Sequence, residues 1–221
     1  MLTPGLAFAD RTFDAILFDM DGTLISSIAA VDRSWARWAG EYGYDSETFQ
    51  ISHGTPARTL VEQLVPPEQV EEAVARINAI ELADTDGVLL LPGTGSLFEA
   101  LPADRHAIIT SCTRDLALAR IAAAGITAPG VVVTADDVAH GKPDPEPFVL
   151  GAALLGFAPS RCLVVEDAPA GLASGRAAGC ATLAVNGTHD LTELDADAHA
   201  PGLARVGVVV AADGTLRIVD L

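Results

Sequence analysis

The segment Phe18-Asp19-Met20-Asp21-Gly22-Thr23-Leu24 constrains this chain more than any other stretch of its sequence. It follows the apolar run 13–18, which predicts a β-strand that ends just before the two aspartates. Residues i and i+2 of an extended chain point to the same side, so Asp19 and Asp21 can face one pocket. Gly22 then permits a sharp turn and lets the backbone approach a ligand closely.

Two carboxylates this close together raise each other's pKa unless a cation or a separation of tasks keeps them apart. A divalent metal resolves that conflict, with one aspartate acting as a nucleophile and the other as an acid. The alternative is an exposed Asp-Gly turn after a buried strand. The segments that follow favour the reactive pocket.

Composition limits the classes of partner. Among the 221 residues 50% are hydrophobic and 5% aromatic, which suits helices packed on a sheet. The net charge of −17 repels polyanions, so we expect neither nucleic acid nor an anionic membrane surface as a partner. A small phosphorylated metabolite is compatible with this charge where local cations, such as a bound Mg²⁺, overcome the repulsion.

The cysteines and the N-terminal segment predict a compartment. Cys112, Cys162 and Cys180 are odd in number and lack zinc-like spacing, so free thiols in a reducing compartment are expected. Residues 1–10 have no basic region and no long apolar stretch, which argues against a signal peptide. No apolar run approaches the length that spans a bilayer. We therefore expect a soluble, cytoplasmic protein.

Periodicity divides the chain into two parts. Apolar residues at three- and four-residue spacings predict helices over 28–44, 57–65 and 67–84. Strands are then expected at 107–111, 131–134, 162–166 and 181–185, alternating with helices at 94–101, 114–124, 146–155 and 168–178. This alternation predicts an α/β fold, a Rossmann-like parallel sheet with helices on both faces. Residues 1–26 and 92–221 would form this core, and residues 27–91 an inserted helical cap.

The C-terminal stretch has a different pattern. Two apolar runs, 206–210 and 216–219, flank Asp213-Gly214, which predicts a β-hairpin. We expect this hairpin to extend the edge of the sheet.

The remaining candidate residues follow predicted strands, where an open α/β sheet binds its ligands. Thr110-Ser111-Cys112 offers hydroxyl and free N–H groups at the start of a helix, which is the geometry of an anion site. Lys142 is the only lysine of the chain and lies in a loop rich in glycine and proline. Its compact ammonium suits a phosphoryl oxygen, although a surface lysine is the alternative.

Glu166 and Asp167 end the strand expected at 162–166. Two acids at the end of a buried strand are costly unless they are paired or bound to a metal. Asp167 could instead cap the next helix. A third oxygen ligand for Mg²⁺, beside the two aspartates of the first strand, is the interpretation we favour.

In this order the four segments resemble the haloacid dehalogenase superfamily, specifically its phosphatases with a small C1-type helical cap, over nearly the whole chain. The segments similar to its four motifs are Asp19 to Leu24, then Ser111, then Lys142, and last Glu166-Asp167. The resemblance implies that Asp19 is a nucleophile that becomes aspartyl-phosphate and that Asp21 is the acid and base. It also implies Mg²⁺ held by Asp19, the backbone carbonyl of Asp21 and Asp167, phosphoryl oxygens bound by Ser111, the Cys112 N–H and Lys142, and a supporting role for Glu166.

Further segments narrow the resemblance to the sugar- and polyol-phosphate phosphatases, a branch with hexitol, 2-deoxyglucose-6-phosphate and glycerol-3-phosphate phosphatases. These segments are 31–35, 51–54, 85–93, 110–115 and 141–148. The implied activity is Mg²⁺-dependent hydrolysis of phosphate monoesters of small sugars or polyols through an aspartyl-phosphate. Cys112 is a departure, because relatives often carry glycine there.

Two other functions stay open at this stage. A sugar phosphomutase of the β-phosphoglucomutase type resembles the chain in all four motifs, and a non-catalytic binding module could keep the fold. A phosphonatase is excluded because the cap has no lysine, and a dehalogenase because that branch lacks the second aspartate.

The cap supplies the candidates for substrate specificity. His53 and Arg58 are the candidate substrate-binding residues of the cap, while Trp35 and Trp38 are expected in its core rather than as platforms for a sugar. The apolar face of the first cap helix is also compatible with a homodimer, so both a monomer and a homodimer are open.

Overall fold

The apolar first strand lies inside the main sheet, with a neighbouring strand on each side, and all of its residues are buried. An apolar sequence suits this position, because the side chains on both faces of the strand are covered. The computed structural model describes residues 1–45, 47–51 and 55–221. In it, six strands are hydrogen-bonded in the order β5-β4-β1-β6-β7-β8, and every pair is parallel. The strands are β1 Ala15–Phe18, β4 His106–Ile109, β5 Val132–Val133, β6 Cys162–Glu166, β7 Ala181–Val185 and β8 Ala198–Ala200.

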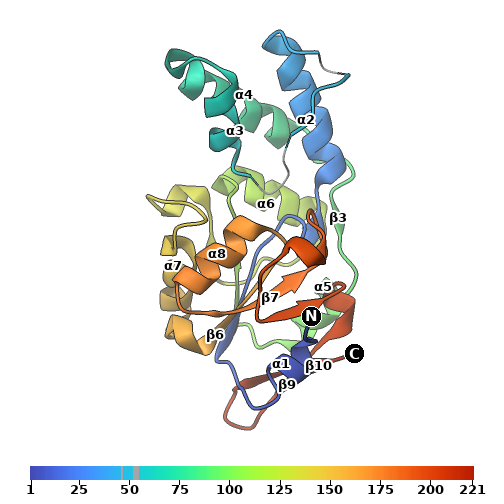
Figure 1. Ribbon diagram of the computed structural model, residues 1–221, viewed down its shortest axis with the longest axis vertical. Coiled ribbons are helices and arrows are strands. Elements are labelled where there is room, and N and C mark those ends of the chain that lie inside the picture. The colour runs from blue at the N-terminus through green and yellow to red at the C-terminus, as the bar shows by residue number, and fades with distance from the viewer. Residues whose placement is uncertain (46, 52–54) are drawn as a thin grey trace.

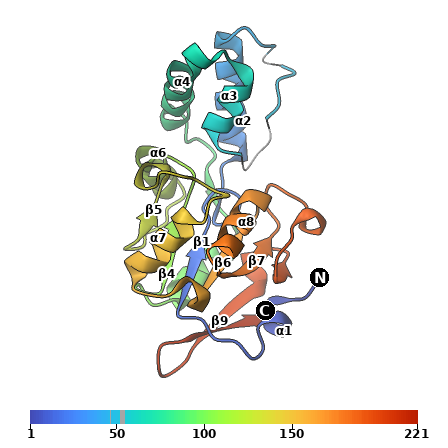
Figure 2. The ribbon, with the colours of Figure 1, turned by 60° about the vertical axis from the view of Figure 1, so that its left-hand side comes forward.

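Helices cover both faces of this sheet, as predicted (Figures 1 and 2). They are α5 Thr94–Ala100, α6 Arg114–Ala123, α7 Glu146–Leu155 and α8 Pro169–Ala177. Alternate strand residues serve opposite faces. Ile16 and Phe18 pack in the same cluster as Leu97 of α5 and Ile121 of α6. Leu17, between them, packs in a second cluster with residues of α7. The α/β class expected from the sequence is therefore confirmed.

The position of the C-terminal hairpin differs from the prediction, which placed it at the edge of the main sheet. β9 Val206–Val210 and β10 Leu216–Asp220 pair with each other as a separate two-stranded sheet. The edge position after β7 belongs instead to β8, whose sequence Ala-His-Ala is too short for an alternating pattern to be recognised. An isolated antiparallel bridge joins Leu216 of the hairpin to Phe13, just before β1. The short helix α1 Pro4–Ala7 packs against β10.

Three helices form a lobe of their own beyond the carboxyl ends of the strands (Figures 1 and 2). They are α2 Ile28–Glu41, α3 Ala57–Leu64 and α4 Val70–Ala83, and we call them the helical lobe. Its hydrophobic cluster is separate from those of the sheet and includes Trp35, Trp38 and Ile77. The Trp38 side chain is fully buried and its Nε1–H donates to the Ala73 carbonyl at 3.0 Å, so it is a core residue as expected.

Two short strands join the helical lobe to the sheet. β2 Ile25–Ser26 and β3 Leu89–Leu90 pair antiparallel, with Ile25 opposite Leu90 and Ser26 opposite Leu89. The sequence did not indicate this pairing, because two-residue strands carry no periodicity. The chain therefore leaves and re-enters the core through one two-stranded ribbon. A further contact between the two parts is the packing of α4 against α6.

The other elements are short 3₁₀ turns, at Pro67–Gln69, Ala135–Asp137, Pro159–Arg161, Leu191–Glu193 and Leu203–Arg205. The helix expected over 67–84 therefore begins with one such turn, and the helix expected over 28–44 ends at Glu41. Among the described residues, no helix combines the length and the apolar character that crossing a bilayer requires.

Candidate active site

The turn after β1 brings the first carboxylates to the edge of the sheet. Gly22 N donates to the Ile25 carbonyl at 2.8 Å, so the chain reverses directly after the two aspartates. Gly22 has a φ of +90°, a conformation that favours glycine. A Cβ at this position would also overlap the carboxylate of Asp167. Position 22 therefore requires glycine for two reasons, the positive φ of the backbone and the lack of space for a Cβ beside Asp167.

Lys142 is a buried residue of this site and not a surface lysine. Its Nζ donates to Asp19 Oδ1 at 2.7 Å, to Glu166 Oε1 at 2.8 Å and to the Ile109 carbonyl at 2.8 Å. Burial lowers the pKa of Lys142, but the charges of Asp19 and Glu166 more than compensate, so the pKa lies above its usual range. The ammonium thus stays charged and has all three of its protons engaged.

Three buried acids lie together beside this ammonium. Oxygens of Asp19, Glu166 and Asp167 lie within 4.8 Å of one another. Burial raises the pKa of Asp19 to about 7, with the charge of Glu166 adding to the effect. Burial and the charge of Asp19 raise the pKa of Asp167 to about 6. One ammonium cannot neutralise three carboxylates, so the cluster favours a further cation, and its hard oxygen donors fit Mg²⁺.

The neighbours of Asp167 and Glu166 explain how these acids are held. Asp167 Oδ2 accepts hydrogen bonds from Thr188 N at 2.7 Å and Thr188 Oγ1 at 2.6 Å. Its side chain does not cap α8, which begins after Ala168 without a side-chain cap, so the capping alternative is wrong. Glu166 Oε2 accepts from the backbone N–H groups of Asp167 and Ala168, both at 3.0 Å. Glu166 therefore fixes both Lys142 and the loop that carries Asp167.

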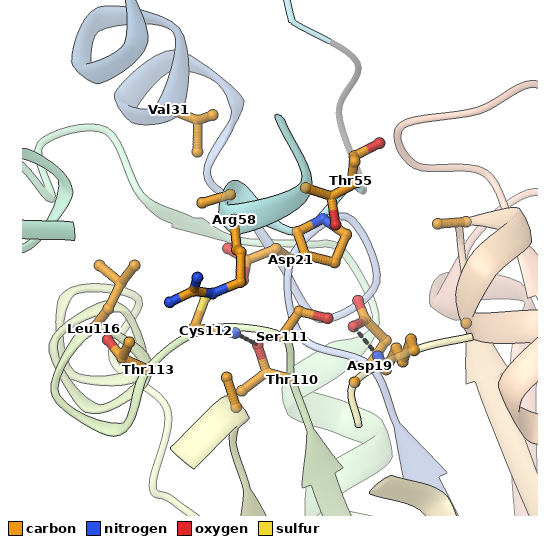
Figure 3. A pocket seen from close by; sticks show the side chains of 18 of the residues that line it. Asp19, Asp21, Val31, Thr55, Arg58, Thr110, Ser111, Cys112, Thr113 and Leu116 are labelled. Atoms are coloured by element: carbon orange, nitrogen blue, oxygen red, sulfur yellow. Dashed lines mark hydrogen bonds and ion pairs between the residues drawn. The ribbon is translucent and has the colours of Figure 1, made fainter. Parts of the chain in front are cut away.

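The loop between β4 and α6 forms the opposite wall. Ser111 is exposed to the cavity, while the Cys112 N–H donates to Thr110 Oγ1 at 3.1 Å (Figure 3). The predicted contact of this N–H with a phosphoryl oxygen would have to replace that bond. The Cys112 thiol donates to Asp21 Oδ2 at 3.3 Å.

Arg120 and Glu81 are two charged residues of the cavity that were not predicted from the sequence. Arg120 Nη1 lies 3.0 Å from Asp21 Oδ1 and 3.2 Å from Cys112 Sγ. Arg120 Nη2 lies 3.5 Å from Glu81 Oε1 on α4. Arg120 follows Leu116 and Ala117 on the buried face of α6. A charged residue within an apolar stripe was the signal that could have revealed it.

The predicted site residues meet at one cavity of about 630 Å³ between the helical lobe and the sheet. Those that line it are Asp19, Asp21, Arg58, Ser111, Cys112, Lys142, Glu166 and Asp167. Figure 3 shows Arg58 of α3 and Thr55, just before that helix, on the side of the cavity opposite Ser111 and Asp19. Arg58 forms a bidentate ion pair with Glu71, at 2.7 and 2.9 Å. His53 lies outside the described residues.

The sequence and the fold match known proteins. The model of the haloacid dehalogenase-like hydrolase family matches residues 13–179. Hexitol phosphatase A of Escherichia coli K12 is 43% identical over 192 residues, which are 83% of this chain and 89% of that protein. Glycerol-1-phosphate phosphohydrolase 2 of Saccharomyces cerevisiae is 37% identical over 191 residues, 80% of this chain and 76% of that protein.

Solved structures share the fold. A hydrolase from Pseudomonas syringae superposes with a TM-score of 0.73 at 24% identity, covering 86% of this chain and 94% of that one. β-Phosphoglucomutase from Clostridium difficile has a TM-score of 0.71 at 20% identity, covering 87% and 92%. At these identities the likeness shows the fold alone.

Proposed function

The chain belongs to the haloacid dehalogenase-like hydrolases, and on that premise we propose that it hydrolyses phosphate monoesters of small sugars or polyols. The names of the relatives support this substrate class, since hexitol phosphatase A and a glycerol-1-phosphate phosphohydrolase are among them. The observation that carries the proposal is the contact of the buried Lys142 ammonium with Asp19, on a cavity large enough for a small phosphorylated metabolite. Phosphatase chemistry at this site is therefore the conclusion we draw.

Asp19 is the proposed nucleophile. Its Oδ1 accepts from Lys142, and an oxygen of the same carboxylate attacks phosphorus as the bond to the leaving oxygen breaks. This first step transfers the phosphoryl group to Asp19 and splits a very slow hydrolysis into two easier steps. A water molecule then attacks phosphorus, releasing inorganic phosphate and restoring the carboxylate.

Asp21 is the proposed acid and base. It gives a proton to the leaving oxygen in the first step and takes one from the attacking water in the second. The two aspartates therefore divide the work, as their spacing along the first segment suggests.

One cationic and two neutral hydrogen-bond donors would hold the phosphoryl oxygens. Lys142 supplies a fixed positive charge, and Ser111 supplies a hydroxyl that faces the cavity. A phosphoryl oxygen that contacts Lys142 directly would replace one of its three present acceptors. The Cys112 N–H is the third proposed donor. Such preorganised donors stabilise the charge that develops on the phosphoryl group.

The acid cluster is the proposed Mg²⁺ site. Asp19, Asp167 and the backbone carbonyl of Asp21 would hold the ion, with Glu166 supporting Lys142 and the Asp167 loop. When bound, Mg²⁺ offsets the charge of the carboxylates and polarises a phosphoryl oxygen.

The helical lobe is the proposed cap, with residues 27–91 as the insertion and residues 1–26 and 92–221 as the core. It would enclose the substrate and supply the contacts that select it. Arg58 is the described candidate for such a contact, and it would have to leave Glu71 to bind a substrate. His53 stays a candidate from the sequence alone.

The decisive experiment measures phosphate release from a panel of phosphorylated sugars and polyols, with and without Mg²⁺. Asp19→Asn removes the nucleophile while keeping the size of the side chain. We expect it to fold, with an unchanged circular dichroism spectrum, and to lose activity by several orders of magnitude, about 10³-fold or more. Retention of more than a few per cent of the activity would refute the assignment of Asp19. Formation of an isomeric sugar phosphate without phosphate release would identify a mutase instead.

A further inference from the structure

Arg120 lies between a carboxylate of the core and a carboxylate of the helical lobe. On the core side its Nη1 contacts Asp21 Oδ1 at 3.0 Å and Cys112 Sγ at 3.2 Å. On the other side its Nη2 contacts Glu81 Oε1 at 3.5 Å. Glu81 belongs to α4, which packs on α6, the helix that carries Arg120. One guanidinium thus connects the two parts of the molecule at the wall of the cavity.

The contact is buried, so each member depends on the others. Arg120 is 5% exposed and Glu81 is 7% exposed. Burial raises the pKa of Glu81, and the charge of Arg120 partly reverses this effect. A buried charge without its partner is strongly unfavourable, so Arg120 and Glu81 hold each other in place. The planar fork of arginine allows one side chain to serve two carboxylates at once.

Both oxygens of Asp21 are engaged on the side of α6. Oδ1 accepts from Arg120 and Oδ2 accepts from the Cys112 thiol. The direction of this carboxylate is therefore set by Arg120 and Cys112, and Arg120 is itself held by Glu81 of the helical lobe. If α4 moves away, Glu81 moves with it and Arg120 loses its second carboxylate.

We propose that Arg120 is a positioning residue for Asp21, and that Glu81 makes the orientation of Asp21 depend on the position of the helical lobe. The inference rests on the proposed phosphatase function, in which Asp21 protonates the leaving oxygen. Proton transfer is then available when the helical lobe is seated over the substrate. Neither residue needs to touch the substrate for this role.

The dependence of the rate on the leaving group tests the role directly. A sugar alkoxide needs a proton in order to leave, whereas p-nitrophenolate is stable without one, so only the first depends strongly on Asp21. The probes are sorbitol 6-phosphate and p-nitrophenyl phosphate, compared by kcat/KM in wild type, Arg120→Lys and Glu81→Gln. For Arg120→Lys we expect kcat/KM to fall about 10- to 100-fold for sorbitol 6-phosphate, the scale of a misplaced reacting group. For p-nitrophenyl phosphate we expect a change within about threefold, because little proton transfer is lost.

Glu81→Gln keeps the shape of the side chain and removes its charge. We expect Glu81→Gln, like Arg120→Lys, to lower the ratio of kcat/KM for sorbitol 6-phosphate to kcat/KM for p-nitrophenyl phosphate. In the double variant we expect this ratio to be close to that of the more impaired single variant, because the two residues act through one contact. Glu81→Gln alone carries the test if Arg120→Lys does not fold. Arg114→Lys is the matched control, because Arg114 is on the same helix but pairs with Asp137 outside the cavity. We expect its ratio to equal that of the wild type.

Two outcomes separate this inference from the proposed function. Equal losses on both probes in either variant would show a merely structural role and overturn the inference, while the phosphatase function would stand. A wild type that releases phosphate from neither probe would overturn the proposed function, and the inference with it.

Discussion

Two glycines leave the space in which the acid cluster is packed. A Cβ at Gly171 would overlap Glu166 Oε1, and a Cβ at Gly187 would overlap the Gly22 carbonyl. These glycines let helix α8 and the loop after β7 approach the carboxylates closely. The site therefore depends on space as much as on charge, because a buried acid cannot shift without losing its partners.

Gly171→Ala tests this requirement for space. The added methyl group would displace Glu166 and with it the Lys142 ammonium, so we expect activity to fall at least about tenfold and stability to fall by about 1–3 kcal/mol. Steady-state kinetics and urea unfolding measure the two effects. Gly130→Ala is the control, because a Cβ there meets nothing within 4 Å. Normal activity of Gly171→Ala would show that Glu166 is free to move.

The raised pKa values of Asp19 and Asp167, about 7 and about 6, predict how stability depends on pH. A carboxyl whose pKa is raised in the folded state contributes stability that is complete below its unfolded pKa of about 4 and is lost as the pH rises through the folded value. We therefore expect the melting temperature of the wild type to decrease, relative to that of Asp167→Asn, as the pH rises from 5 to 7. EDTA is present in this experiment so that no divalent metal is bound.

Mg²⁺ at the proposed site should reverse this trend, because the ion would bind the carboxylates in their deprotonated form. Saturation at about 100 times the dissociation constant would stabilise the folded state by about 2.7 kcal/mol. Thermal unfolding with and without Mg²⁺ at each pH measures this gain. We expect the gain to be larger at pH 7 than at pH 5 and to be small in Asp167→Asn. A gain that does not depend on pH would place the ion away from these acids.

At the scale of secondary structure, the sequence was most informative where an element is apolar and clearly bounded. The predicted bounds of β6, β7 and α7 agree with the structure, since each is a mostly apolar segment bounded by turn residues. The position of the C-terminal hairpin was wrong because apolar runs around Asp213-Gly214 indicate pairing but not which sheet the pair joins. The contact of Arg120 with Glu81 was missed for a similar reason, because it arises only when α4 packs on α6.

The helical lobe has its own hydrophobic cluster, and both tryptophans of the chain lie within it on α2. Tryptophan fluorescence therefore reports on this lobe, whereas circular dichroism reports on the whole chain. Ile77 of α4 is fully buried in the cluster. We expect Ile77→Ala to lower the unfolding free energy followed by fluorescence by about 2–5 kcal/mol.

The signal from circular dichroism should shift less than the fluorescence signal in the same urea titration. Leu82→Ala is the control, because that side chain is 44% exposed and should change neither signal by more than about 0.5 kcal/mol. Coincident shifts of both signals in Ile77→Ala would show that the lobe and the sheet unfold as one cooperative unit.

At the scale of the whole molecule, the net charge of −17 opposes the approach of a phosphate ester. Salt screens this repulsion, since the Debye length falls from about 30 Å at 0.01 M to about 8 Å at 0.15 M ionic strength. At saturating Mg²⁺ we expect kcat/KM for a dianionic phosphate ester to rise over this range, with kcat nearly constant. A fall in kcat/KM with added salt would mean that the cations of the site dominate the field that the substrate meets.

The ribbon of β2 and β3 has a consequence for how such a protein can diversify. Ser26 and Leu89 are paired residues, so the intervening segment starts and finishes at the same place on the sheet. Because the two ends of this segment are held side by side by the ribbon, its length and composition can change at little entropic cost to the folding of the sheet. Recombination at these two neighbouring points would exchange the helical lobe as one piece, Glu81 included, and leave the strand ends that carry the acid cluster unchanged.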